Sequence, residues 1–163
     1  MKSISLWQPW ATLIAVGAKT YETRHWSTPY RGPLIIHAAK KWDRDLYSFT
    51  LMSPFAKCLH EGGYRVGGGY DTKGNTLPLG AFVCVVDLAE IIPTEDVRDS
   101  LSEQEQAFGN YASGRFAWRL DNVRAFPEPA PARGYQGLWD PLEGADPPMV
   151  ALINKLYQKE NNL

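Results

Sequence analysis

The chain has few of the residues that mark a disulfide scaffold, a metal site or a membrane span. Its 163 residues include 2 cysteines and 3 histidines, and none of them has the spacing of metal ligands. Cys58 and Cys84 lie far apart in apolar surroundings, which predicts two buried free thiols rather than a disulfide. The apolar stretch at residues 10–16 is too short to cross a bilayer. We therefore expect no metal, no cofactor and no membrane association.

Net charge is also small, because 17 basic and 18 acidic side chains leave a formal value of −1. Such a chain has no overall field that would hold it on nucleic acid. The charges are uneven, however: residues 19–44 contain six bases and two acids, and residues 87–106 contain seven acids and one base. This asymmetry is compatible with one basic functional face.

The first residues do not resemble a secretory signal, so a cytoplasmic location is the expectation.

The length predicts one domain, and 14 glycines with 12 prolines predict many turns. Short apolar runs predict strands at residues 3–6, 33–39, 81–92, 116–120 and 123–126. Helical spacing and capping residues predict helices at residues 9–17, at 43–60 with a break at Pro54, after a capping box at 100–103, and around 149–157. Strands mixed with short helices, without regular alternation, predict an α+β fold built around a small barrel.

The predicted domain covers residues 1–141, with a glycine-rich loop inserted at about 62–80. Residues 142–163 form a predicted C-terminal extension, whose helix packs on the domain through an apolar stripe. The three glycines at 67–69 do not form a phosphate-binding P-loop, because no strand precedes them and no helix follows. The proline-rich residues 127–131 predict an extended segment at a sheet edge.

The segment with the most chemical character is residues 17–24, which reads G-x-K-x-x-E-x-R. In an extended chain alternate residues share a face, so Glu22 and Arg24 are predicted to point the same way. The turn after the first helix would bring Lys19 beside them. A carboxylate between two cations can orient a polar ligand, hold a water or bind a phosphate through the cations. The alternative interpretation is a solvated strip of ion pairs.

Several motifs in the same order resemble the ASCH domain family of the PUA-like superfamily. They are the segment at 17–24, the residues S-L-W-Q-P-W before it, Y-R-G-P-L-I-I-H-A after it, and the stretches 80–88, 116–120 and 134–139. The resemblance runs over roughly residues 3–139 and is interrupted at the glycine-rich loop. It implies a small PUA-like β-barrel with flanking helices, and a cleft lined by residues 17–24. Members of the superfamily are associated with RNA or DNA binding.

We therefore predict a cleft that binds RNA, another single-stranded nucleic acid or a modified nucleoside. Recognition of a base needs a ring for stacking, with donors and acceptors for the base edge. Trp7 and Trp26 are also candidate rings, although core packing is the alternative for each tryptophan. His37 closes a buried strand, either as a histidine with internal partners or as a donor to the ligand. The predicted ligand-binding residues are Gln8, Trp10, Lys19, Glu22, Arg24, Tyr30, Arg31, His37 and Trp118.

Two other functions stay open at this stage. Some small bacterial members of the superfamily resemble amidohydrolases that remove the acyl group of N4-acetylcytidine. Their lysine matches Lys19, whereas a threonine stands where this chain has Glu22, which is a departure from the family pattern. If the chain is an enzyme, we predict Lys19 and Glu22 as its catalytic residues. A further acid downstream would come from Asp87, Glu103 or Glu105. A protein-interaction domain that docks through the acidic helix near Glu103 is the third alternative.

Overall fold

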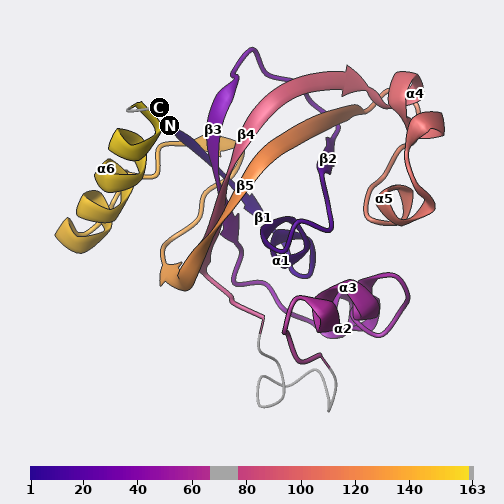
Figure 1. The fold of residues 1–163 in the computed structure, drawn as a ribbon, viewed down its shortest axis with the longest axis horizontal. Coiled ribbons are helices and arrows are strands. Elements are labelled where there is room, and N and C mark those ends of the chain that lie inside the picture. The colour runs from indigo at the N-terminus through magenta and orange to yellow at the C-terminus, as the bar shows by residue number, and fades with distance from the viewer. Residues whose placement is uncertain (67–76, 162–163) are drawn as a thin grey trace.

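One curled, mixed sheet of six strands organises the protein (Figure 1), and the computed structural model describes residues 1–66 and 77–161. The strand order is β2-β5-β4-β3-β1-β6. β1 and β3 are parallel, and all other neighbours in this sheet are antiparallel. The sheet closes halfway toward a barrel, which confirms the predicted α+β barrel-like fold in a single domain. The strands are β1 (Lys2–Leu6), β2 (Tyr21–Arg24), β3 (Gly32–Ala38), β4 (Ala81–Pro93), β5 (Phe116–Pro131) and β6 (Leu138–Trp139).

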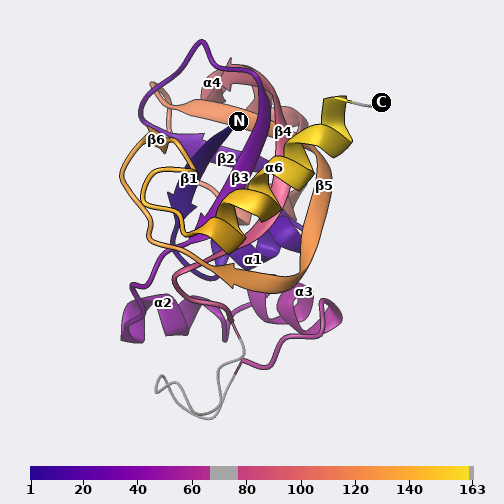
Figure 2. The same cartoon turned by 90° about the vertical axis from the view of Figure 1, so that its left-hand side faces the viewer.

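Helices flank this sheet on both faces and at both ends. They are α1 (Trp10–Ala15), α2 (Arg44–Phe49), α3 (Phe55–Glu61), α4 (Thr94–Val97), the 3₁₀ helix η1 (Arg98–Ser100), α5 (Glu103–Ala107) and α6 (Pro147–Asn161). Helix α1 lies inside the curl of the sheet, and α6 lies against the outer face (Figure 1). Figure 2 shows α6 crossing in front of the strands.

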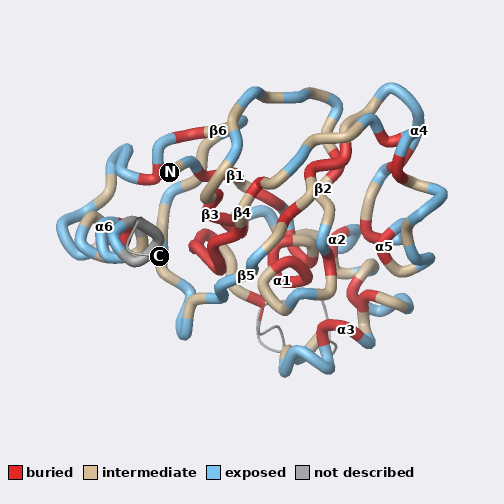
Figure 3. The backbone as a smooth tube through the Cα atoms, turned by 45° about the horizontal axis from the view of Figure 1, so that its top comes forward, coloured by how far each residue is buried: buried red, intermediate tan, exposed pale blue. Residues whose placement is uncertain are grey.

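Alternation along β3 explains why both faces of the sheet are covered. Leu34 and Ile36 pack in the inner cluster with Ile14 of α1, whereas Ile35 packs on the other face with Ile153 of α6. Successive side chains of a strand point to opposite faces, so the continuous apolar run of β3 requires cover on both. Buried residues are concentrated along these strands and α1 (Figure 3).

The sequence predicted one helix boundary correctly, at Pro54, and misplaced another, at the start of α5. The break at Pro54 divides the predicted helix into α2 and α3, and Asp43 caps α2 by accepting from the backbone N–H of Leu46 at 2.9 Å. The predicted capping box at 100–103 is wrong by two residues. Ser102, not Ser100, caps α5, because the backbone is extended at Leu101 and Ser102 and helix begins only afterwards.

A single 16-residue strand, β5, replaces the two short strands predicted in this region. Its register against β4 shifts near Asn122, whose φ of 52° bends the strand without ending it. The proline-rich end of β5 pairs with β4 but not with β2, which contacts only residues 116–119. Prolines are tolerated there because the open edge requires no N–H donors. The predicted edge segment is therefore observed as the end of a strand.

The two cysteines are free and buried, as predicted. Burial raises the pKa of the Cys84 thiol, which keeps it in the unreactive neutral form. Part of the predicted glycine-rich insertion, residues 67–76, lies outside the described residues.

Candidate functional site

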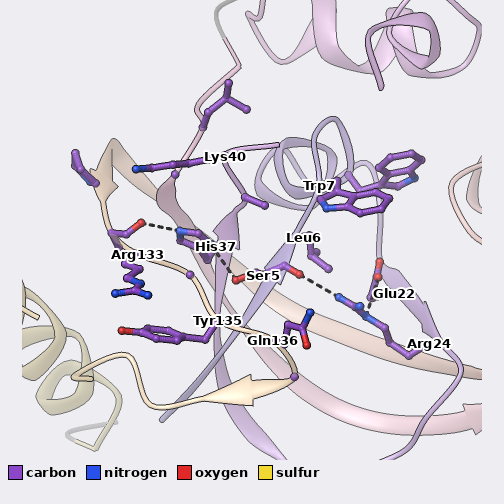
Figure 4. A pocket seen from close by; sticks show the side chains of 18 of the residues that line it. Ser5, Leu6, Trp7, Glu22, Arg24, His37, Lys40, Arg133, Tyr135 and Gln136 are labelled. Carbon is purple, nitrogen blue, oxygen red and sulfur yellow. Dashed lines mark hydrogen bonds and ion pairs between the residues drawn. The ribbon is translucent and has the colours of Figure 1, made fainter. Parts of the chain in front are cut away.

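A cleft of about 1390 Å³ opens where several strand ends meet (Figure 4). Its walls come from the end of β1 with the turn after it, the start of α1, the ends of β2 and β3 with the residues that follow them, the residues just before β4, and the end of β5 with residues 132–137. These segments are far apart in the chain and are brought together by the curl of the sheet.

The G-x-K-x-x-E-x-R segment turns its charged side chains toward one another. Gly17, with a φ of 79°, ends α1, and the backbone N–H of Lys19 then bonds to the carbonyl of Leu13 at 3.0 Å. The Lys19 side chain is fully buried, and its Nζ lies 3.4 Å from Glu22 Oε2. The same Nζ donates to the carbonyl of Phe108 at 3.0 Å. Lys19 therefore does not line the cleft, although it was predicted to bind the ligand; it contacts Glu22, which does line the cleft.

Glu22 and Arg24 share one face of β2, as predicted, and both line the cleft. Arg24 Nε lies 3.2 Å from Glu22 Oε1, and the Glu22 side chain is only 14% exposed. The Arg24 guanidinium also donates to the carbonyl of Ser5 at 3.2 Å. A solvated strip of ion pairs does not fit this arrangement, because the central carboxylate is mostly covered and its partner Lys19 is fully buried.

Glu105 is the one downstream carboxylate of the three candidates that contacts this segment. Its carboxylate accepts from the backbone N–H of Thr20 at 3.0 Å, from the Thr20 hydroxyl at 2.9 Å, and from the N–H of Tyr21 at 3.0 Å. Glu105 thus holds the start of β2 from behind. Asp87 instead pairs with Arg124 at 3.0 Å, and Glu103 is an exposed residue of α5.

His37 lines the cleft although it is 2% exposed. Its Nε2 lies 2.9 Å from the carbonyl of Ala132, which can only accept, so Nε2 carries the proton. Nδ1 then accepts from the Ser5 hydroxyl at 3.0 Å. Burial lowers the pKa of His37 below its usual value, and the Lys40 ammonium adds to this effect. The ring is therefore neutral and has internal partners for both nitrogens.

Gly134 lies so close to this pair that no side chain fits. A Cβ there would lie 2.4 Å from the ring of His37 and 2.6 Å from Ser5 Oγ. The segment after β5 thus packs its bare backbone over the Ser5–His37 hydrogen bond.

Aromatic rings stand around the opening of the cleft. Trp7 is 50% exposed, and the ammonium of Lys41 lies 3.9 Å from the centre of its ring. Trp26 and Tyr135 are half-buried lining residues. Trp10 also lines the cleft, but its ring packs edge-on against Phe49 and Phe55.

Two predicted ligand-binding residues are buried elsewhere. The Gln8 amide donates to Thr12 Oγ1 at 2.7 Å and to the carbonyl of Pro78 at 2.9 Å, and its oxygen accepts from the N–H of Thr12. Trp118 is a fully buried core residue whose indole N–H donates to the carbonyl of Trp26 at 3.3 Å. Both side chains use their polar groups inside the protein, so the structure places them outside the cleft.

Tyr30 and Arg31 also lie outside the cleft lining. The Tyr30 hydroxyl donates to the carbonyl of Pro33, which fastens the loop before β3. The exposed Arg31 donates to the carbonyls of Thr28 and Tyr30, at 2.8 and 2.7 Å. Tyr30 is close to β2 in sequence, but neither side chain is among those that line the cleft.

The polar lining residues that sequence reasoning missed include Ser5, His25, Lys40, Arg133 and Gln136. Ser5 and Gln136 belong to the segments that resemble the ASCH family, so the resemblance could have identified these two residues as candidates. Nothing in their spacing placed residues 131–137 beside β1 and β3.

Within the described residues, no helix is long and apolar enough to cross a membrane, and no cluster of side chains could hold a metal ion.

A half-closed mixed sheet with a helix in its curl and a cleft at its strand ends defines a small α+β domain with a barrel-like sheet. Residues 4–130 match the ASCH domain, and the chain belongs to this family. It is 27% identical over 137 residues to activating signal cointegrator 1 of Homo sapiens and of Mus musculus, covering 83% of this chain. The chain spans about a fifth of the length of these relatives, since the match covers 21% of each.

The fold is also that of a solved ASCH structure from Zymomonas mobilis. That structure superposes with a TM-score of 0.52 at 16% identity, covering 95% of this chain and 94% of the other. A Y47F mutant of the same protein gives a TM-score of 0.52 at 17% identity, covering 95% of this chain and 96% of the other. At this identity the likeness concerns the fold alone.

Proposed function

We propose that the cleft binds single-stranded nucleic acid, RNA in preference, by accepting one base among its aromatic rings. The observation that carries the proposal is the arrangement of the Glu22–Arg24 pair and the exposed Trp7 indole on one cleft. Base recognition needs this combination of a stacking surface with charged hydrogen-bonding groups.

Each group has a distinct part in this proposal. Lys41 covers one face of Trp7, and a base stacks on the other face. Glu22 accepts from a base amino group, and Arg24 donates to a base carbonyl. Because the chain has a net charge of −1, affinity must come from the cleft and its adjacent cations rather than from the whole surface.

The test is a fluorescence anisotropy titration of a labelled single-stranded RNA octamer, with the DNA octamer and an RNA duplex of the same sequence as competitors. Replacing Trp7 with Ala removes the stacking surface and should cost about 1–3 kcal/mol of binding free energy. Trp7→Phe should retain most of the affinity. Arg31→Gln removes one positive charge outside the cleft and serves as the control. Equal binding by wild type and Trp7→Ala, or no binding at low salt, would refute the proposal.

An amidohydrolase acting on N4-acylated cytidine is the second candidate, favoured by the 3.4 Å contact between Lys19 and Glu22. Binding is the better supported function, because the Lys19 ammonium is fully buried and also donates to the carbonyl of Phe108. A general base must reach the proton that it removes, directly or through one water. Incubation with N4-acetylcytidine separates the two functions: release of cytidine that disappears in Lys19→Met would establish the enzyme.

A further inference from the structure

We propose that Lys40 and Arg133 form a phosphate subsite at the end of the cleft opposite Glu22. The ligand that fills the whole cleft is then a nucleotide, with its base toward Glu22 and its phosphate toward Lys40. This inference rests on the proposed function and adds the orientation and the class of the ligand.

The sheet brings both cations to the same cleft although they lie far apart in the chain. Lys40 follows β3, Arg133 follows β5, and Gly80 precedes β4 between them. The N–H of Ala132 donates to the carbonyl of Gly80 at 2.9 Å, which extends the β4–β5 ladder to this point. Figure 4 shows the charged ends of Lys40 and Arg133 on the same side of His37, with Glu22 and Arg24 on the opposite side.

Both side chains are exposed, but Lys40 packs closely on the backbone and Arg133 lies beside an aromatic ring. A Cβ on Gly80 would lie 2.7 Å from Cγ and 2.8 Å from Cε of Lys40, so the alkyl chain of Lys40 packs directly on the bare backbone there. Gly80 also has a φ of 61°, which favours glycine independently. The guanidinium carbon of Arg133 lies 5.3 Å from the centre of the Tyr135 ring.

Neither cation has a carboxylate partner among the residues that the structure describes. Arg24 differs, because it is engaged by Glu22 and by the carbonyl of Ser5. A phosphate at the Glu22 end would meet a carboxylate, whereas at the Lys40 end it meets two cations. Guanidinium and ammonium groups are the donors that phosphate oxygens prefer.

The size of the cleft agrees with a ligand larger than a base. Pockets for small molecules usually measure about 300–1,000 Å³, and this cleft measures about 1390 Å³. A single stacked base leaves the Lys40 end empty, and a ribose with its phosphate extends toward it.

Isothermal titration calorimetry tests this assignment with the four ribonucleosides, their 5′- and 3′-monophosphates, and inorganic phosphate. A monophosphate of the preferred base should bind about tenfold more tightly than its nucleoside, because its phosphate gains charged hydrogen bonds that the nucleoside lacks. In the double variant Lys40→Gln/Arg133→Gln, the monophosphate and the nucleoside should bind with about equal affinity. The affinity for the nucleoside itself should stay unchanged. The advantage should also shrink as NaCl is raised.

The matched control is Arg31→Gln with Lys57→Gln, which removes two charges from exposed positions outside the cleft. It should leave the tenfold advantage intact. Thermal melting of each variant shows whether it is folded, and no large change is expected at exposed side chains.

The possible failures are distinguishable. If nucleosides bind and their monophosphates bind no more tightly, the phosphate subsite is refuted and the base site stands. An advantage that survives the Lys40 and Arg133 substitutions equally refutes it. If no nucleoside, nucleotide or oligomer binds, the proposed function is refuted together with this inference.

Discussion

Replacement of Glu22 by Gln tests the reasoning about the site most directly, because it removes one charge and keeps the shape. Glu22 lies 3.4 Å from Lys19 Nζ and 3.2 Å from Arg24 Nε. With an effective dielectric constant of about 20, each contact corresponds to about 5 kcal/mol of gross Coulomb attraction. Desolvation offsets much of this, and losing one partner of a buried pair typically costs about 3–5 kcal/mol.

The expected result is a large loss of stability. The fully buried Lys19 ammonium would lose its counter-charge and keep only neutral acceptors, the carbonyl of Phe108 and the new amide oxygen. For a chain of this size each kcal/mol lowers Tm by about 2–4 °C, so Glu22→Gln should lower Tm by about 6–20 °C. Differential scanning calorimetry measures this shift.

Glu90→Gln is the matched control, because it makes the same substitution in a solvated pair. Glu90 lies 3.2 Å from Arg119, but the two side chains are 51% and 41% exposed. Such pairs are worth about 0–1 kcal/mol, so Tm should fall by less than about 4 °C. Equal Tm shifts for Glu22→Gln and Glu90→Gln would refute the argument that burial makes the Glu22 pair strong.

A binding titration on folded Glu22→Gln separates structure from recognition. If the carboxylate accepts from a base amino group, affinity per folded molecule should fall about tenfold, or about 1.4 kcal/mol. A large fall in Tm with unchanged binding would show that Glu22 supports the fold and does not contact the ligand.

Three further predictions concern the supports of the cleft. Glu105→Gln replaces a carboxylate that accepts three hydrogen bonds at the start of β2. The Tm should therefore fall by several degrees, and the affinity for RNA should weaken. A stable variant with wild-type affinity would contradict this prediction. Gly134→Ala should destabilise the protein or displace residues 131–137, seen as a lower Tm in thermal melting, because its Cβ would collide with His37 and Ser5. Since the pKa of His37 is lowered in the fold, the unfolded chain binds the extra proton first. Stability should therefore be lost as pH falls below about 6.5, and the slope of urea-derived unfolding free energy against pH should flatten in His37→Gln.

Local patterns predicted the secondary structure well where a single physical rule decided it. The break at Pro54, the helix end at Gly17 and the buried run of β3 follow from backbone geometry and from apolar periodicity. The same rules misplaced the cap of α5, because Ser100 and Ser102 are equivalent as caps until the tertiary structure sets the path of the chain between them. They also divided β5 into two strands, since a bulge cannot be told from a turn in the sequence.

The sequence by itself determined the family, the element types and the grouping of Lys19, Glu22 and Arg24, because these depend on short spacings along one chain segment. Only the tertiary structure decided which other side chains reach the cleft. Gln8 and Trp118 turn into the protein, whereas Lys40 and Arg133 turn toward the cleft. Their placement depends on contacts such as the hydrogen bond from His37 to the carbonyl of Ala132, which joins residues 95 positions apart. Periodicity sets which face of its own element a side chain occupies, but the curl of the sheet sets what that face meets.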